Sequence, residues 1–201
     1  MEKARSIGAE LVKSLRSLTG AGFVDCKNVL TETDGDLEKA VELMRKKGLA
    51  RAQKKANREA REGLIYSYIH AGGRIGVLLE INCETDFVAR TSEFQELAKN
   101  ISMHIAASNP LYVKREMLPP ELIAKEKEIY REQLISIDKP QAVKEKIISG
   151  KLEKYYKDVC LLEQPFIKDP SKNISSIIEE EVLRLGENIA LKRFVRYQLG
   201  E

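Results

Sequence analysis

Two short runs of β-branched and aromatic residues on either side of a glycine pair predict a β-hairpin in this chain. The runs cover residues 63–71 and 74–82, and Gly72-Gly73 separates them. Glycines between two such runs are typical of a tight hairpin turn. In the second run alternate positions are apolar, as in a strand with one buried face: Ile75, Val77, Leu79 and Ile81. The pattern predicts a small antiparallel sheet.

The residues before the hairpin have the apolar spacing of helices. Three short helices are predicted within residues 1–48, with glycine-containing turns at 19–22 and 34–36. Asp36 is expected to cap the third helix and Gly48 to end it. A bundle this short has a small core, which is typical of a recognition module. The apolar positions of the three helices are Ile7, Leu11, Leu15 and Leu18, then Val24, Cys26, Val29 and Leu30, then Leu37, Ala40, Val41 and Met44.

Long helices are predicted after the hairpin. The first is expected to end before Asn109-Pro110, because proline disfavours helix in the residue ahead of it. Residues 119–138 and 140–162 predict two helices that form a projecting helical hairpin. The buried positions predicted for the first helix are Phe94, Leu97, Ile101 and Ile105; those for the helical hairpin are Leu122, Ile129, Leu134 and Ile137 on one side and Val143, Ile147, Leu152 and Tyr156 on the other.

The remaining predicted elements are a helix near residues 173–185 and a final strand over residues 189–197, which could join the sheet. Sheet and helices are segregated along the chain, so the predicted fold class is α+β. The predicted parts are a three-helix domain at 1–48, a linker at 49–62, and an α+β core at 63–201 that contains the helical hairpin at about 119–162.

The composition narrows the classes of protein to which this chain can belong. Of the 201 residues 43% are hydrophobic and 32% are charged, and no apolar stretch approaches the length of a membrane span. The N-terminal residues enter an amphipathic pattern without the apolar region of a signal peptide, so the expected location is the cytoplasm. The three cysteines are far apart and predict reduced, buried thiols with no disulfide or metal site.

The positive charge is concentrated before the β-hairpin. The net charge is +3, and residues 1–62 carry 14 Lys and Arg against 10 Asp and Glu. Most of the excess lies in residues 45–61, which contact RNA or an acidic partner on one interpretation and form a solvated linker on the other. The absence of interleaved aromatic residues favours the linker.

No combination of residues predicts catalysis. His104 lies on the apolar face of its helix and is expected in the core, and His70 lies beside the hairpin turn. Glu84 and Asp86 have no nucleophile or metal ligand near them in sequence. There is also no phosphate-binding loop and no glycine-rich dinucleotide turn. We therefore expect a protein that is not an enzyme and that holds no cofactor or metal.

The segment between the second strand and the following helix is unusual for a surface loop. Thr85-Asp86-Phe87-Val88 occupies a loop or the first turn of the helix, and an exposed phenylalanine there forgoes about 2 kcal/mol of burial. Two interpretations are open at this point. Phe87 packs back onto its own core, or it is presented to another protein.

Together these segments resemble the elongation factor Ts family, the exchange factors of the GTPase elongation factor Tu. The resemblance covers almost the whole chain. It rests on Thr19-Gly-Ala-Gly-Phe-Val-Asp-Cys26, Asp36-Leu-Glu-Lys-Ala40, Ile75-Gly-Val-Leu-Leu-Glu-Ile-Asn-Cys-Glu-Thr-Asp-Phe-Val-Ala89, Met103-His-Ile-Ala-Ala-Ser108, Gln164-Pro-Phe-Ile-Lys-Asp169 and Gly186-Glu-Asn-Ile189. With one Thr-Asp-Phe loop, the chain is similar to the short, single-core form.

The resemblance implies a ubiquitin-associated-like (UBA-like) N-terminal domain, an α+β core and a protruding helical hairpin. It implies a guanine nucleotide exchange factor that binds elongation factor Tu with GDP and releases the GDP by disturbing the magnesium and phosphate site. It further implies a homodimer formed through the sheet and the last strand, without direct contact to nucleic acid or membrane. The partner-binding residues that it implies are Thr85, Asp86, Phe87, Val88, His70, Arg16, Phe23 and Val24.

One departure and two other functions bear on this interpretation. Phe23 and Val24 stand where methionines are common in the family, so the apolar character is kept and the shape is changed. An adaptor that binds ubiquitin-like or nascent polypeptides would explain the N-terminal bundle but leaves Phe87 without a role. An RNA-binding protein would use residues 45–61 and would show an affinity that falls steeply with salt.

Overall fold

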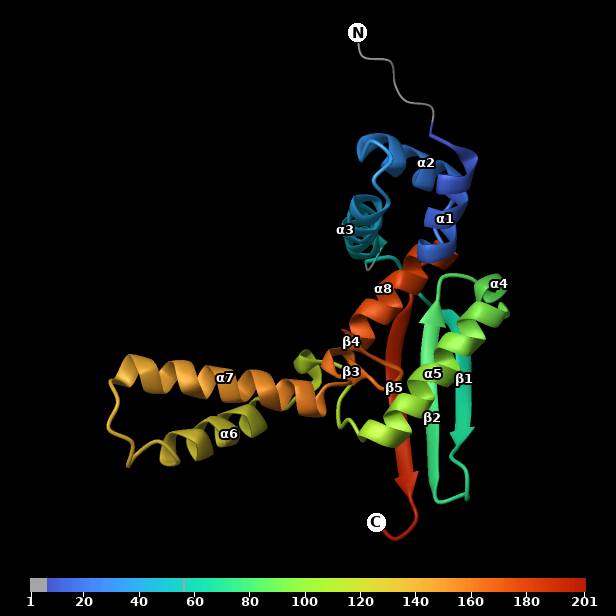
Figure 1. The fold of residues 1–201 in the computed structure, drawn as a ribbon. Helices are drawn as coiled ribbons and strands as arrows, with labels where there is room; N and C mark the ends of the chain where they lie inside the picture. Colours follow the sequence, from blue (N-terminus) through green and yellow to red (C-terminus); the bar gives the residue numbers. More distant parts are fainter. Residues whose placement is uncertain (1–6, 56) are drawn as a thin grey trace. The chain divides into compact units, whose positions relative to one another are not determined.

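The computed structural model describes residues 7–55 and 57–201 (Figure 1). The chain forms two compact units whose segments alternate along the sequence. One unit contains the residues up to Leu64 together with Asn82–Leu97 and Ile177–Ala190. The other contains Ile65–Ile81, Ala98–Ser176 and Leu191–Glu201. The predicted division at residues 48 and 62 stays a prediction.

The first unit begins with the predicted three helices, α1 (Ala9–Thr19), α2 (Phe23–Glu32) and α3 (Leu37–Lys55). Gly20 ends α1 in the left-handed conformation, with φ of 66°, and its N–H donates to the carbonyl of Arg16. A side-chain oxygen of Asp36 accepts from the N–H of Lys39 at 3.0 Å, which confirms the predicted cap of α3. The helices share one core: Val12, Leu15, Ala21, Cys26, Val29, Leu30, Ala40 and Met44.

Three expectations for this bundle are wrong. The third helix continues through Gly48 to Lys55, so it includes half of the predicted linker. Glycine is favoured at position 48 because a β-carbon there would overlap the side chain of Leu183 in α8 (Ile174–Leu185). Leu18 and Val24 were predicted in the apolar stripes of the first and second helices, but both lie on exposed sides of their helices. The side chains of residues 49–54, which carry part of the basic run, lie outside the described residues.

The sheet has three strands, β1 (Glu62–Ile69), β2 (Ile75–Cys83) and β5 (Ala190–Gln198), in the order β1-β2-β5. Neighbouring strands run antiparallel (Figure 1). The N–H of His70 donates to the carbonyl of Ile75 at 2.9 Å and closes the predicted hairpin. The last strand joins the sheet of the hairpin, as predicted, and it lies beside β2.

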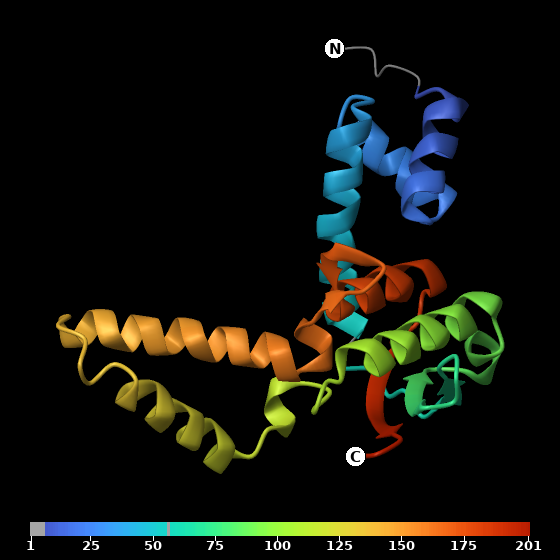
Figure 2. The same cartoon turned by 60° about the horizontal axis from the view of Figure 1, so that its bottom comes forward.

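One face of the sheet is covered by helix α5 (Ser92–Ser108), which runs along it in both views (Figures 1 and 2). Arg196 of β5 donates to the carbonyl of Ala106 in α5 at 3.3 Å. The predicted apolar positions of β2 and α5 are buried, apart from the half-buried Ile75. The other face stays open and carries exposed apolar side chains: Ile65, Ile69, Leu78, Val195 and Tyr197.

Helices α6 (Pro120–Glu132) and α7 (Gln141–Val159) form the predicted helical hairpin (Figure 2). Residues 133–140 connect them, so the first helix ends six residues before the predicted Asp138. Ile137 and Val143 are exposed beside this connection, while Ile148 is buried with Leu134 and Leu152. These two predicted positions are wrong: Ile137 lies in the connection, beyond the end of α6, and Val143 lies on the exposed side of the first turn of α7.

The base of the helical hairpin is held by Arg115, in a 3-10 turn (Arg115–Met117). Its guanidinium forms ion pairs with Glu153, at 2.6 Å, and with Glu163. It also lies 4.3 Å from the ring centroid of Tyr156. A second 3-10 turn (Leu161–Glu163) and a two-stranded ribbon of β3 (Pro165–Phe166) and β4 (Asp169–Asn173), which the sequence did not predict, lead into α8.

Candidate partner-binding loop

The Thr85–Val88 segment forms a single capped turn at the end of β2. Thr85 is the N-cap of the short helix α4 (Asp86–Ala89), and its hydroxyl oxygen accepts from the N–H of Val88 at 3.4 Å. Val88 and Ala89 are buried and anchor the turn. The turn is therefore fixed from its inner side, and its first residues face outward.

Phe87 is exposed, with 77% of its surface accessible to solvent. This excludes the interpretation in which the ring packs back onto its own core. In a single turn of helix, neighbouring residues point in different directions, so the burial of Val88 and Ala89 leaves Phe87 on the outside. Beside it, the carboxylate of Asp86 pairs with Arg90 at 2.8 Å, in an exposed pair of small energetic value.

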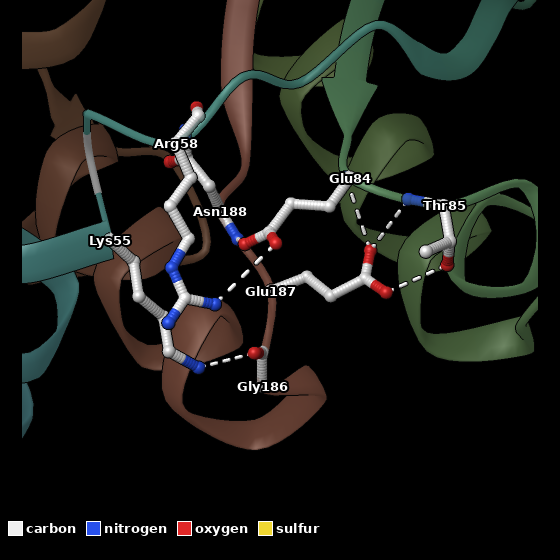
Figure 3. A network of polar contacts seen from close by, with 7 residues as sticks. All are labelled: Lys55, Arg58, Glu84, Thr85, Gly186, Glu187 and Asn188. Atoms are coloured by element: carbon white, nitrogen blue, oxygen red, sulfur yellow. Dashed lines mark hydrogen bonds and ion pairs between the residues drawn. The ribbon is translucent and has the colours of Figure 1, made fainter.

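The backbone before the turn is held by two residues that follow α8 (Figure 3). The carboxylate of Glu187 accepts from the N–H groups of Glu84 and Thr85, at 3.1 and 3.0 Å, and from the Thr85 hydroxyl at 2.7 Å. In return, the Glu84 carboxylate accepts from the N–H of Asn188 at 2.6 Å. Sequence reasoning missed both residues, although the Gly186-Glu-Asn-Ile189 motif, to which it assigned no role, contains them.

Arg58 closes the same network from the segment before β1. Its carbonyl accepts from the side-chain amide of Asn188 at 2.7 Å, and its guanidinium lies 3.5 Å from the Glu84 carboxylate. The ammonium of Lys55 donates to the carbonyl of Gly186. Three segments that are far apart in sequence therefore meet at Glu84 and Thr85, directly before the turn that carries Phe87 (Figure 3).

The N-terminal residues implied by the family resemblance lie on the surface of the helix bundle. Arg16 is exposed in the last turn of α1. Phe23 and Val24 are exposed neighbours that begin α2 directly after Gly22. Both are apolar, and neither contributes to the core of the bundle.

His70 belongs to the other compact unit and is exposed at the end of β1. Its Nδ1 lies 3.0 Å from the hydroxyl of Tyr68, and the two rings are tilted with centroids 6.1 Å apart. A joint action of His70 and Phe87 stays a prediction.

The remaining histidine is a core residue, as predicted. His104 is fully buried in α5, and its Nε2 lies 2.9 Å from the Oε1 of Gln164. The side-chain amide of Gln164 donates to the carbonyl of Asp158, so Gln164 Oε1 is the acceptor and His104 carries its proton on Nε2. Burial lowers the pKa of His104 below its ordinary value.

The three cysteines are free and buried, as predicted. Burial raises the pKa of Cys83 and of Cys160 to about 11, so neither thiol is a good nucleophile at neutral pH. Within residues 7–55 and 57–201, no group of three or more His, Cys, Asp or Glu side chains is placed to hold a metal ion. No described helix has the length and apolar character needed to cross a membrane.

A three-helix bundle, an α+β core and an outward-facing aromatic turn are the features that the resemblance to a family of translation factors implies. The model of the family described as Elongation factor TS matches residues 24–201. Elongation factor Ts of Fervidobacterium nodosum is 60% identical over 195 residues, which cover 97% of this chain and 99% of the relative. Those of Moorella thermoacetica and Thermotoga petrophila are each 57% identical, and the matches cover 97% of this chain and 96% and 97% of the relatives. The chain belongs to the elongation factor Ts family.

Proposed function

We propose that the chain is a guanine nucleotide exchange factor that binds elongation factor Tu with GDP and accelerates the release of GDP. The observation that carries this proposal is the exposure of Phe87 on a turn whose backbone is hydrogen-bonded on its inner side. A mobile aromatic side chain would bind many surfaces weakly. A ring presented by an ordered turn can enter one particular cleft with a smaller loss of conformational entropy, because the backbone is already fixed.

The wedge that we propose is Asp86-Phe87, which enters the GTPase close to its magnesium and phosphate site. Bound Mg²⁺ requires near-ideal octahedral geometry, so a small displacement of its ligands weakens nucleotide binding strongly. By reciprocity, GDP weakens the binding of the factor as much as the factor weakens the binding of GDP. GTP then replaces GDP by mass action. In this mechanism the chain is not an enzyme, and it needs no cofactor or metal of its own.

Arg16, Phe23 and Val24 are proposed to dock the factor on the same GTPase, and His70 to press on the phosphate region. The N-terminal residues are exposed and have no role in their own core, which supports a docking function. In this arrangement the docking surface determines the affinity for the GTPase, and the Asp86-Phe87 wedge determines the rate of GDP release. The proposal places the chain with the translation machinery of the cytoplasm, without direct contact to nucleic acid.

A homodimer is proposed to form through the open face of the sheet. Apolar side chains from all three strands are exposed on this face, including Ile69, Leu78 and Tyr197. A second copy presents the same apolar face, so two copies can cover each other with an isologous contact. The proposal therefore commits to a second copy of this chain as the occupant of the open face.

The release of a fluorescent GDP analogue from purified elongation factor Tu tests the exchange function. The wild-type chain is expected to accelerate release, and Phe87→Ala is expected to lose most of that effect. Leu111→Ala is a matched control, because Leu111 is another exposed apolar side chain, 59% accessible, outside the proposed wedge. An unchanged release rate with the wild-type chain would refute the exchange function.

A further inference from the structure

Two segments about a hundred residues apart hold each other by reciprocal hydrogen bonds beneath the Phe87 turn. The Glu187 carboxylate binds the backbone of Glu84 and Thr85, and the Glu84 carboxylate binds the backbone of Asn188 (Figure 3). Each carboxylate accepts from the backbone of the opposite segment, at 3.0–3.1 Å for Glu187 and at 2.6 Å for Glu84. Such charge-assisted bonds are stronger than those between neutral groups. The arrangement fixes the position of the backbone from which the turn starts.

The second carboxylate oxygen of Glu187 binds Thr85, the N-cap residue of the turn. The Thr85 hydroxyl donates its only hydrogen to Glu187 at 2.7 Å, and the hydroxyl oxygen accepts from the N–H of Val88 at 3.4 Å. Because the hydrogen is committed to Glu187, a lone pair of the same oxygen is free to face Val88. Glu187 thereby selects the orientation of Thr85 in which it caps α4, and α4 begins with Asp86 and Phe87.

We propose that Glu187 is a positioning residue that sets the direction in which Phe87 leaves the strand. This inference rests on the proposed exchange function. Glu187 itself does not touch the partner. Without its carboxylate, the turn samples several directions, and only a fraction of the molecules present the ring correctly. Because the docking surface on α1 and α2 binds every conformer equally, docking does not select the correct direction, and the maximal rate of GDP release from the docked complex falls in proportion to that fraction.

The positioning role can be measured in the free protein, independently of any partner. Amide hydrogen exchange followed by NMR reports on the N–H groups of Glu84 and Thr85, both of which donate to the Glu187 carboxylate. In Glu187→Ala these two amides are expected to exchange faster, by about tenfold or more. Glu187→Gln keeps one acceptor oxygen and is expected to retain part of the protection. Unchanged exchange of both amides in Glu187→Ala would overturn the inference.

The functional consequence is measured as the rate of GDP release against the concentration of factor. Glu187→Ala is expected to lower the maximal rate about tenfold while the half-saturating concentration changes little, because the docking surface is intact. Glu187→Gln is expected to lie between Glu187→Ala and the wild type. Glu128→Ala, which removes an exposed carboxylate from α6, is the charge-matched control. A lower affinity with an unchanged maximal rate would overturn the inference.

A double variant distinguishes positioning from an independent role. If Glu187 acts through Phe87, Glu187→Ala has little further effect in a Phe87→Ala background. Additive losses would overturn the inference. Should Glu187→Ala fail to fold, the pair Thr85→Ser and Thr85→Val makes the same comparison, with the hydroxyl kept in the first and lost in the second. If the wild-type chain fails to accelerate release, the proposed function fails, and the amide exchange still decides whether Glu187 holds the turn.

Discussion

Two glycines inside helices are expected to respond in opposite ways to the same substitution. Gly48 lies within α3 and Gly150 within α7. A β-carbon at Gly150 would have no neighbouring atom within 4 Å, whereas one at Gly48 would overlap the Leu183 side chain. Since glycine is about 1 kcal/mol less favourable than alanine inside a helix, Gly150→Ala is expected to stabilise the fold by up to that amount.

At Gly48 the same gain is opposed by a steric cost. The added carbon would lie 3.1 Å from Cγ of Leu183 and closer still to one of its methyl groups, so rotation of that methyl alone does not relieve the contact. Extra carbon in a packed contact costs about 1–3 kcal/mol, and an overlap of this kind belongs in the upper half of that range. The net expectation for Gly48→Ala is a loss of about 1–2 kcal/mol after the gain in helix propensity is subtracted.

Thermal and urea unfolding of the two variants measures this difference. Gly48→Ala is expected to lower the Tm by about 2–8 °C, and Gly150→Ala to raise it by a few degrees. A Leu183→Ala background removes the overlapping atoms, so Gly48→Ala is expected to be less harmful there, with a coupling of about 1 kcal/mol or more. Equal stabilisation by both alanines would show that α8 does not pack on α3 at Gly48.

Three further expectations follow from other parts of the molecule. Arg16→Ala and Phe23→Ala are expected to raise the half-saturating concentration of factor in the GDP-release assay more than they lower the maximal rate, and an equal effect on both would argue against a pure docking role. Tyr197→Asp places a charge on the open apolar face and is expected to shift the chain from dimer to monomer in sedimentation, whereas a monomeric wild type at micromolar concentration would refute the dimer. Because burial lowers the pKa of His104, the folded chain takes up a proton at a lower pH than the unfolded chain, so the stability that neutral His104 contributes is complete above about pH 6.5 and is lost as the pH falls below it. Urea unfolding of the wild type and His104→Gln between pH 5 and 7.5, a range set by the ordinary histidine pKa, measures this, and an identical pH dependence of the two would contradict it.

Most of the elements could be predicted from local patterns in the sequence. The hairpin around Gly72-Gly73, the buried face of α5 and the cap at Asp36 depend on residues close together in the chain, so their spacing is sufficient evidence. The ends of elements were less predictable. Gly48 resembles a helix terminator but is an interior glycine, because its small size is needed for contact with a residue more than a hundred positions away.

The candidate site, like the fold, could be predicted from the sequence only in part. The sequence identified the Thr85–Val88 segment and, through its motifs, the family to which the chain belongs. It left open whether the Phe87 ring is buried or exposed, since both outcomes fit a phenylalanine in a short loop. Only the packing of Val88 and Ala89 decided that the ring lies outside. The role of Glu187 could not be predicted from the sequence either, because it depends on the groups that this carboxylate contacts in the folded chain.

The sequence by itself thus determined the order and type of the elements, the α+β class and the family. The tertiary structure alone decided what lies beneath the Phe87 turn and which surfaces remain open. The physical reason is that hydrophobic period, caps and turns act over a few residues, whereas the contacts of Glu187 with Thr85 and of Leu183 with Gly48 join residues that are distant in sequence. Such contacts exist only after the chain has folded.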